Sequence, residues 1–182
     1  IGGILGGIFS RALVVLTRRP PALIAKLRRT PALFAAVCGL IVAVMSVSTG
    51  GYASGNGYAE THAGLVTGVH IPVWYGPFKL VSTLLSSASG IPGGLFSPSL
   101  AVGAGLGSMV TPLFTFIEPR ALMLLMTVGY FAAVVQSPLT AVVIVMEMTS
   151  DRNMVIPLMA TALLGAGISR LIQREPLYHA LS

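Results

Sequence analysis

The stretch that decides the fold is SGIPGGLFSPSLAVGAG (residues 89–105), an apolar segment interrupted by glycines and prolines. An uninterrupted membrane-spanning helix has no use for such breaks, and a soluble loop would be less apolar. Proline is favoured in the first turn of a helix, because its missing N–H would have no partner there. The stretch therefore predicts a helix that starts within residues 96–98 and runs to about Val110. In front of it, Gly93 and Gly94 leave the backbone open to close approach.

A helix start of this kind is suited to binding an anion. The first amides of a helix have no acceptor within it, and the helix dipole adds partial positive charge there. The backbone amides of Leu95, Phe96 and Ser97 are therefore candidates to bind an anion without a lysine or arginine. A site made only of backbone dipoles holds an ion weakly enough for the ion to leave again. The residues alone leave a second interpretation open, in which the glycines serve helix packing and the prolines only kink the chain.

The composition places the chain in a membrane. Of its 182 residues, 54% are hydrophobic and only 9% are charged, and the mean hydropathy is +0.87. Soluble domains carry about 25% charged residues, so this chain cannot cover a globule with a solvated surface. Long runs without any charge extend over residues 30–59, 80–117 and 121–146. Because a transmembrane helix needs roughly 20 apolar residues, we expect a multipass integral membrane protein.

The net charge of +6 does not indicate nucleic-acid binding, because no fold for reading bases accompanies it. Five of the eleven basic residues fall in one short segment between two apolar runs: Arg18, Arg19, Lys26, Arg28 and Arg29. Under the positive-inside rule such a segment is a cytoplasmic loop. Arg170 and Arg174 indicate the same side for the region near the C-terminus.

Apolar runs and helix breakers predict a series of helices, several of them too short to cross a bilayer. The expected helices cover residues 1–16, 32–48, 60–69, 75–87, 96–110, 119–135, 139–148 and 154–173, and residues 48–64 are expected to be irregular. Half-length helices must end inside protein or at a water-filled cavity, because exposed backbone cannot face lipid. Broken helices whose ends meet near the midplane are typical of transporters. The expected fold class is all-α, a multipass bundle of tilted and broken helices.

Three segments resemble one known family. SGIPGGLFSPSLAVGAGLG (residues 89–107) resembles the GxFxP signature of the CLC chloride channel and chloride/proton exchanger family. GYFAAVVQSPLTAVVIVMEMT (residues 129–149) and EPLYHAL (residues 175–181) are similar to two later segments of that family, in the same order and spacing. The resemblance implies that residues 1–182 are a single transmembrane domain fragment. It would be the second of the family's two inverted halves plus its last helix, without the first half.

The resemblance also implies roles for individual residues. Leu95 and Phe96 would offer backbone amides to a central anion, and the amide of Ser97 would lie near the next site outward. Tyr178 would place its hydroxyl on the central anion from the inner side, a role that suits a phenol because it donates one hydrogen bond and stays neutral. The residues that would support the anion loop are Gly93, Gly94 and Pro98. The family implies no cofactor and no metal, with chloride as the transported ligand.

As a member of this family, the parent protein would transport chloride-like anions, either as a voltage-gated-type channel or as a chloride/proton antiporter. Its partners would be chloride or a similar small anion, protons in the antiporter case, the lipid bilayer, the missing N-terminal half and a second copy in a homodimer. We expect it in the plasma (inner) membrane of a prokaryote, and we expect neither an enzyme nor a nucleic-acid partner. The residues that separate a channel from an exchanger belong to the missing half.

Two functions of other classes stay open. Ser97 could be the nucleophile of an intramembrane protease, although no GxSxG motif and no recognisable general base accompany it. The chain could also be a membrane scaffold in which the glycines serve packing alone.

Other polar residues have weaker patterns. Glu147 lies in an apolar helix, where an acid is a functional hypothesis by default. We expect a structural role for it, with proton transfer as the alternative. Glu60, His62 and His70 match no compact metal-ligand spacing, and loop or interface positions are expected for the histidines.

Overall fold

The computed structural model describes residues 1–18, 20–21, 24–25, 30–68, 71–91, 93–114, 116–173 and 177, and within these ranges it contains helices, turns and loops but no strand. The helices are α1 Gly2–Arg18, α3 Pro31–Ser48, α4 Tyr58–His62, α5 Tyr75–Ala88, α6 Phe96–Val110, α7 Pro119–Val135, α8 Pro138–Thr149 and α9 Val155–Ile172. Single turns of π- or 3₁₀-helix adjoin them at Ala63–Thr67 (η1), Thr111–Leu113 (η2) and Arg152–Met154 (η3). The predicted all-α class is confirmed.

Prolines begin three helices, one at its predicted start and two one residue before it. Pro31, Pro119 and Pro138 are the first residues of α3, α7 and α8, where a missing N–H costs no hydrogen bond. The prediction that residues 48–64 are irregular was wrong in part, because α4 begins at Tyr58 inside that segment. The residue before it, Gly57, has a φ of +72°, a conformation that glycine adopts without steric cost.

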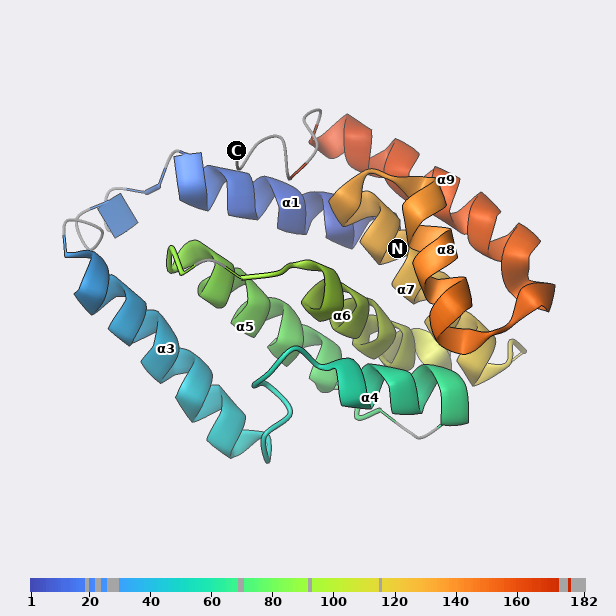
Figure 1. Cartoon of the computed structure of the whole chain (residues 1–182), viewed down its shortest axis with the longest axis horizontal. Helices are drawn as coiled ribbons and strands as arrows, with labels where there is room; N and C mark the ends of the chain where they lie inside the picture. The colour runs from blue at the N-terminus through green and yellow to red at the C-terminus, as the bar shows by residue number, and fades with distance from the viewer. Residues whose placement is uncertain are drawn as a thin grey trace.

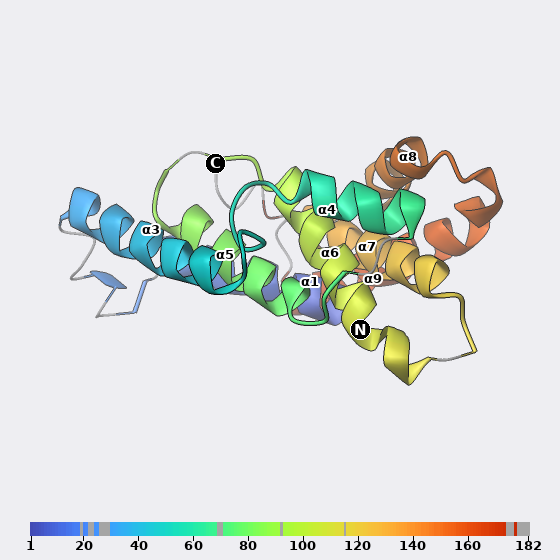
Figure 2. The same cartoon turned by 90° about the horizontal axis from the view of Figure 1, so that it is seen from below.

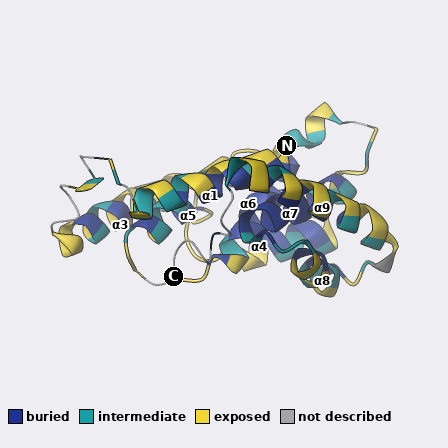
Figure 3. Cartoon of the chain, turned by 90° about the horizontal axis from the view of Figure 1, so that it is seen from above, coloured by how far each residue is buried: buried dark blue, intermediate teal, exposed yellow. Residues whose placement is uncertain are grey.

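Helices α6 and α7 form the centre of the molecule (Figure 3). Helix α7 packs against α6 on one side and α9 on the other, α5 lies against α6, and α1 packs on both α7 and α9 (Figure 1). Every residue of α6 from Ser99 to Ser108 is buried. A helix that is apolar and buried all round belongs to the interior of a large or membrane protein.

Glycines bring helices into backbone contact at several crossings, and at two of them each helix contributes a glycine. A Cβ atom on Gly165 of α9 would lie 2.5 Å from the carbonyl oxygen of Gly129 in α7, and one on Gly3 of α1 would lie 2.8 Å from the Cα atom of Gly165. At the other crossing, a Cβ atom on Gly76 of α5 would lie 2.6 Å from the carbonyl carbon of Gly105 in α6. Small residues permit such close approach between membrane helices.

Helix α3 lies at the periphery of the molecule, where it packs mainly against α5 (Figures 1 and 2). Of its 18 residues only Phe34 and Cys38 are buried. Helices α3 and α9 are long and apolar enough to cross a membrane. Helices α7 and α8, with 17 and 12 residues, reach only about 26 Å and 18 Å at a rise of about 1.5 Å per residue. Helix α8 is therefore shorter than the roughly 30 Å of a hydrocarbon layer, as expected for a broken helix.

Candidate functional site

Helix α6 begins within the stretch that the sequence singled out, and this predicted start is confirmed. Its N-cap residue is Leu95, whose side chain makes no capping hydrogen bond, and the amide of Ser99 donates to the Leu95 carbonyl oxygen at 3.0 Å. The first-turn amides of a helix find no acceptor inside it, and the cap residue supplies none here. The positive end of the helix dipole therefore lies at this point and favours a negative charge.

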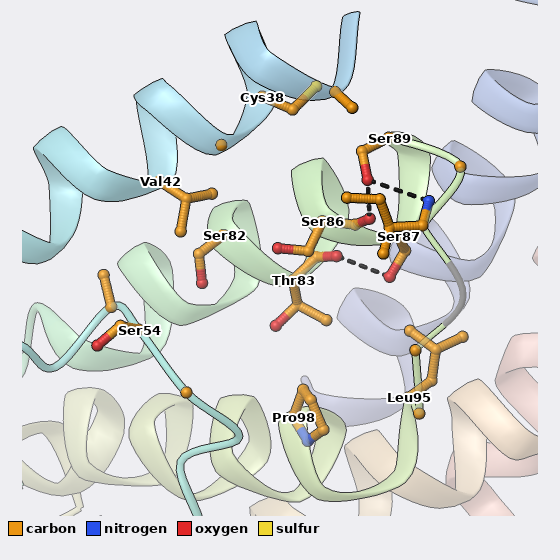
Figure 4. Close-up of a pocket in the computed structure, with 18 residues that line it drawn as sticks. Cys38, Val42, Ser54, Ser82, Thr83, Ser86, Ser87, Ser89, Leu95 and Pro98 are labelled. Carbon is orange, nitrogen blue, oxygen red and sulfur yellow. Dashed lines mark hydrogen bonds between the residues drawn. The ribbon is translucent and has the colours of Figure 1, made fainter. Parts of the chain in front are cut away.

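A cavity of about 600 Å³ lies beside this helix start, between α3, α5 and the loop that carries Ser54 (Figure 4). Four of the predicted site residues line it: Gly93, Gly94, Leu95 and Pro98. Both glycines are exposed, and a Cβ atom added to either would touch nothing within 4 Å. The backbone in front of α6 thus faces open space, as the sequence predicted.

The other predicted residues that the structure describes do not line this cavity. Phe96 is 41% exposed and packs edge-on against Phe131, with the ring centroids 5.3 Å apart. Ser97 is half-buried, and its Oγ donates a hydrogen bond to the carbonyl oxygen of Asn56 at 3.3 Å. Tyr178 lies outside the described residues. Leu177, the residue before it in the sequence, is fully buried in the hydrophobic cluster that also contains Leu95.

Hydroxyl groups line much of the cavity, but most of those on α5 are already used. Thr83 Oγ1 donates to the carbonyl oxygen of Lys79 at 2.7 Å, and Ser87 Oγ donates to that of Thr83 at 2.7 Å. Ser82 Oγ also donates to the carbonyl oxygen of Lys79, at 3.1 Å. A hydroxyl has one hydrogen, so each of these side chains would have to give up its intrahelical bond to donate to an anion. The backbone of α6 is therefore the main source of donors here.

One residue of this region was missed by the sequence reasoning. Lys79 of α5 is 1% exposed, and its Nζ donates hydrogen bonds to the carbonyl oxygens of Ser54 at 2.7 Å and Gly55 at 2.8 Å. Both of these loop residues line the cavity. The available signal was a lysine between Phe78 and Leu80, because a charge within an apolar helix demands a partner.

The remaining polar candidates lie away from the start of α6. Glu147 is exposed near the end of α8. Glu60 is half-buried and lines a separate cavity of about 470 Å³, while His62 stacks on the ring of Tyr58 at 5.7 Å. His70 lies outside the described residues. Across the part of the chain that the structure describes, no group of three His, Cys, Asp or Glu side chains could hold a metal ion.

The sequence matches a known family over most of its length. The model described as voltage gated chloride channel covers residues 1–170. The chain belongs to the voltage gated chloride channel family. The resemblance to CLC proteins is thereby confirmed. The core of the chain contains buried helices, α6 and α7, that are shorter than the roughly 20 residues of a simple membrane span.

Proteins named H(+)/Cl(−) exchange transporter ClcA are among the relatives of this chain. That of Vibrio campbellii is 34% identical over 110 residues, which are 57% of this chain and 23% of the relative. That of Vibrio cholerae (strain O395) is 32% identical over 127 residues, which are 66% of this chain and 27% of the relative. The chain therefore spans about a quarter of the length of these curated relatives.

A solved structure, that of a slow cyanobacterial Cl−/H+ antiporter, has the same fold. The TM-score is 0.75 at 22% sequence identity, and the match covers 99% of this chain and 43% of the antiporter chain. At this identity the likeness establishes the fold alone. The prediction of an all-α multipass membrane fold is confirmed.

Proposed function

We propose that the complete protein containing this chain transports chloride or a similar small anion across a membrane. The observation that carries the proposal is the start of α6, whose cap residue makes no side-chain hydrogen bond and which borders a cavity of about 600 Å³. Helix N-termini bind anions without cationic side chains, and a transported ion must be held only weakly. In this proposal the chain is no enzyme, chloride is its substrate, and no cofactor takes part.

The anion in this proposal is bound by backbone amides from Leu95, Phe96 and Ser97. The side chain of Ser97 already donates to Asn56, so its amide and not its hydroxyl serves the ion. Gly93, Gly94 and Pro98 shape the backbone around these amides without adding side-chain donors.

Tyr178 completes the proposed site with its hydroxyl. The support for this assignment comes from its neighbour Leu177, which is fully buried in the same hydrophobic cluster as Leu95. A neutral phenol donates one hydrogen bond without trapping the ion in a strong charge pair.

The proposed mode is antiport of chloride against protons, because the named curated relatives are H(+)/Cl(−) exchange transporters. We place the protein in the inner membrane of a prokaryote as a homodimer with one pore per subunit. Residues 1–182 form one transmembrane unit of this pore. The antiporter chain of the same fold is matched over only 43% of its length, so we assign the rest of the ion pathway to a second unit.

The experiment that tests the proposed function uses the longest natural protein that contains this chain, purified and reconstituted into liposomes. Chloride efflux and external pH are recorded together after a chloride gradient is imposed. Chloride release with opposing proton movement is the expected result. Chloride release without protons would retain anion transport but replace the antiporter by a channel. A folded protein that moved no small anion would contradict the assignment of the α6 start as an anion site.

A further inference from the structure

Lys79 is a buried charge that the proposed function does not yet use. A charged side chain inside the membrane is expensive and marks a functional site or a partner by default. Its Nζ is bound to the carbonyl oxygens of Ser54 and Gly55, at 2.7 and 2.8 Å. An ammonium group has donors and no acceptor, so it binds the carbonyl oxygens of peptide groups. The N–H of each of these peptide groups then points away from the ammonium group.

The loop that Lys79 holds forms one wall of the cavity beside α6. Ser54 and Gly55 line this cavity together with Leu95 and Pro98, and Figure 4 shows Ser54 on a loop at the side of the cavity away from Leu95. The peptide groups of this wall therefore face the same space as the candidate anion site.

The next residues of the loop are fixed by α5 and α6 as well. The carbonyl oxygen of Asn56 accepts the hydrogen bond from Ser97 Oγ at 3.3 Å. A Cβ atom on Gly57 would lie 2.5 Å from the Tyr75 hydroxyl and 3.0 Å from Lys79 Cε, so the loop lies directly against the lysine side chain. Three consecutive carbonyl oxygens, those of residues 54, 55 and 56, are thus bound by protein donors.

We propose that Lys79 is a specificity-determining positioning residue, because it holds the carbonyl oxygens of Ser54 and Gly55 and so keeps these acceptors from turning into the anion cavity. A carbonyl oxygen that pointed into the cavity would repel an anion and favour a cation. This inference rests on the function proposed above. It assigns to Lys79 a role that acts through the loop and not through direct contact with the ion.

Alanine substitutions at two glycines can test the conformation of the loop without changing the charge of Lys79. Gly50 and Gly55 both have a φ of +65°, and a Cβ atom on either would meet nothing within 4 Å. Alanine strains the backbone equally at the two positions, since this conformation is unfavourable for any residue with a Cβ atom. Of the two, only Gly55 is bound by Lys79 and lines the cavity beside α6. Gly50→Ala is therefore a matched control for Gly55→Ala.

The test measures chloride flux against chloride concentration for the same reconstituted protein and four variants. Lys79→Met removes both the donors and the charge, and Lys79→Arg retains them. We expect Lys79→Met and Gly55→Ala to raise the half-saturating chloride concentration by about tenfold, with a smaller effect on the maximal rate. We expect Lys79→Arg and Gly50→Ala to stay within about twofold of the wild type. A residue needed only for folding would change the amount of active protein and leave the half-saturating concentration alone.

Three results would overturn the proposal: unchanged half-saturation in Lys79→Met, equal shifts in Gly50→Ala and Gly55→Ala, or a shift in Lys79→Met without one in Gly55→Ala. The third result would show that the charge of Lys79, and not the position of the loop, causes the change in half-saturating chloride concentration. If Lys79→Met does not fold, as judged by gel filtration and thermal unfolding, the pair of glycine variants decides the question. A folded wild-type protein that moves no anion would instead contradict the proposed function, so the two failures are distinguishable.

Discussion

Ser97 illustrates, at the scale of single residues, how little of the candidate site depends on side chains. Its Oγ is engaged with the carbonyl oxygen of Asn56, while its amide belongs to the first turn of α6. The hydroxyl therefore ties a loop to the helix, and in the proposed site only the backbone amide would bind the ion. The two parts of this one residue can be tested separately.

Replacing Ser97 with alanine should leave anion transport nearly intact. The substitution keeps the amide and removes one neutral hydrogen bond, which contributes about 0.5–1.5 kcal/mol to the free energy of unfolding. Ser97→Pro is the counterpart, because proline is tolerated in the first turn of a helix but removes the N–H. We expect anion affinity, measured by flux in liposomes, to fall only in Ser97→Pro. Loss of transport in Ser97→Ala would show instead that the hydroxyl itself takes part in the site.

At the scale of helices, glycine determines which elements can touch. The crossing of α9 with α7 brings the backbone atoms of Gly165 and Gly129 into contact, and Gly3 of α1 lies against the same point. Three helices therefore meet where none has a side chain. Such a contact gains dispersion energy between backbones but tolerates no added atom.

Gly165→Ala should destabilise the protein, whereas Gly167→Ala on the same helix should not. A Cβ atom at Gly165 would lie 2.5 Å from the Gly129 carbonyl oxygen, while one at Gly167 would meet nothing within 4 Å. We expect Gly165→Ala to lower the free energy of unfolding by about 1–3 kcal/mol. Gly167→Ala should be neutral or stabilising by up to about 1 kcal/mol through helix propensity. Thermal unfolding in detergent measures both, and equal midpoints for the two variants would contradict the close crossing.

Most helix boundaries could be predicted from the sequence, because breakers mark them locally. Pro119 and Pro138 give the starts of α7 and α8, and the predicted start of α6 within residues 96–98 agrees with the observed start at Phe96. The segment around Gly57 could not be read in this way. Its glycines indicate a loop, but a helix follows because α5 and α6 hold that segment in place. Tertiary contact overrides local propensity at such a position.

The candidate site could be predicted only in part, for a similar reason. Gly93, Gly94, Leu95 and Pro98 lie close together in the sequence, and they line one cavity in the structure. Lys79 is held by residues more than twenty positions away, at 25 and 24 residues for Ser54 and Gly55. No local pattern encodes a contact of that range.

At the scale of the whole molecule, α3 and the basic segment before it predict an orientation in the membrane. Helix α3 is apolar over 18 residues and only 11% of it is buried, so most of its surface is available to other membrane components. Under the positive-inside rule we expect the basic residues that precede it on the cytoplasmic side. In this proposed topology, α3 runs from Pro31 at the cytoplasmic side to Ser48 at the opposite side.

This orientation predicts how cysteines at the two ends of α3 react. Thr30 and Ser48 are both exposed and flank the helix. In right-side-out vesicles, a membrane-impermeant maleimide should label Ser48→Cys and spare Thr30→Cys, and inside-out vesicles should reverse the pattern. The unmodified protein gives the background from Cys38, which is buried. Labelling of Thr30→Cys from outside would invert the assigned topology.

The use of backbone donors at the start of α6 also affects how mutations can change the proposed site. Donors that belong to the main chain are common to every amino acid except proline, so a point mutation in the gene changes the side chain at Leu95 or Phe96 while the N–H remains. A single mutation would therefore rarely remove the proposed anion site. Variation in ion preference among descendants of this protein would then accumulate mainly in the surrounding walls, where the loop of Ser54 and Gly55 is held by a side chain that a single mutation can remove.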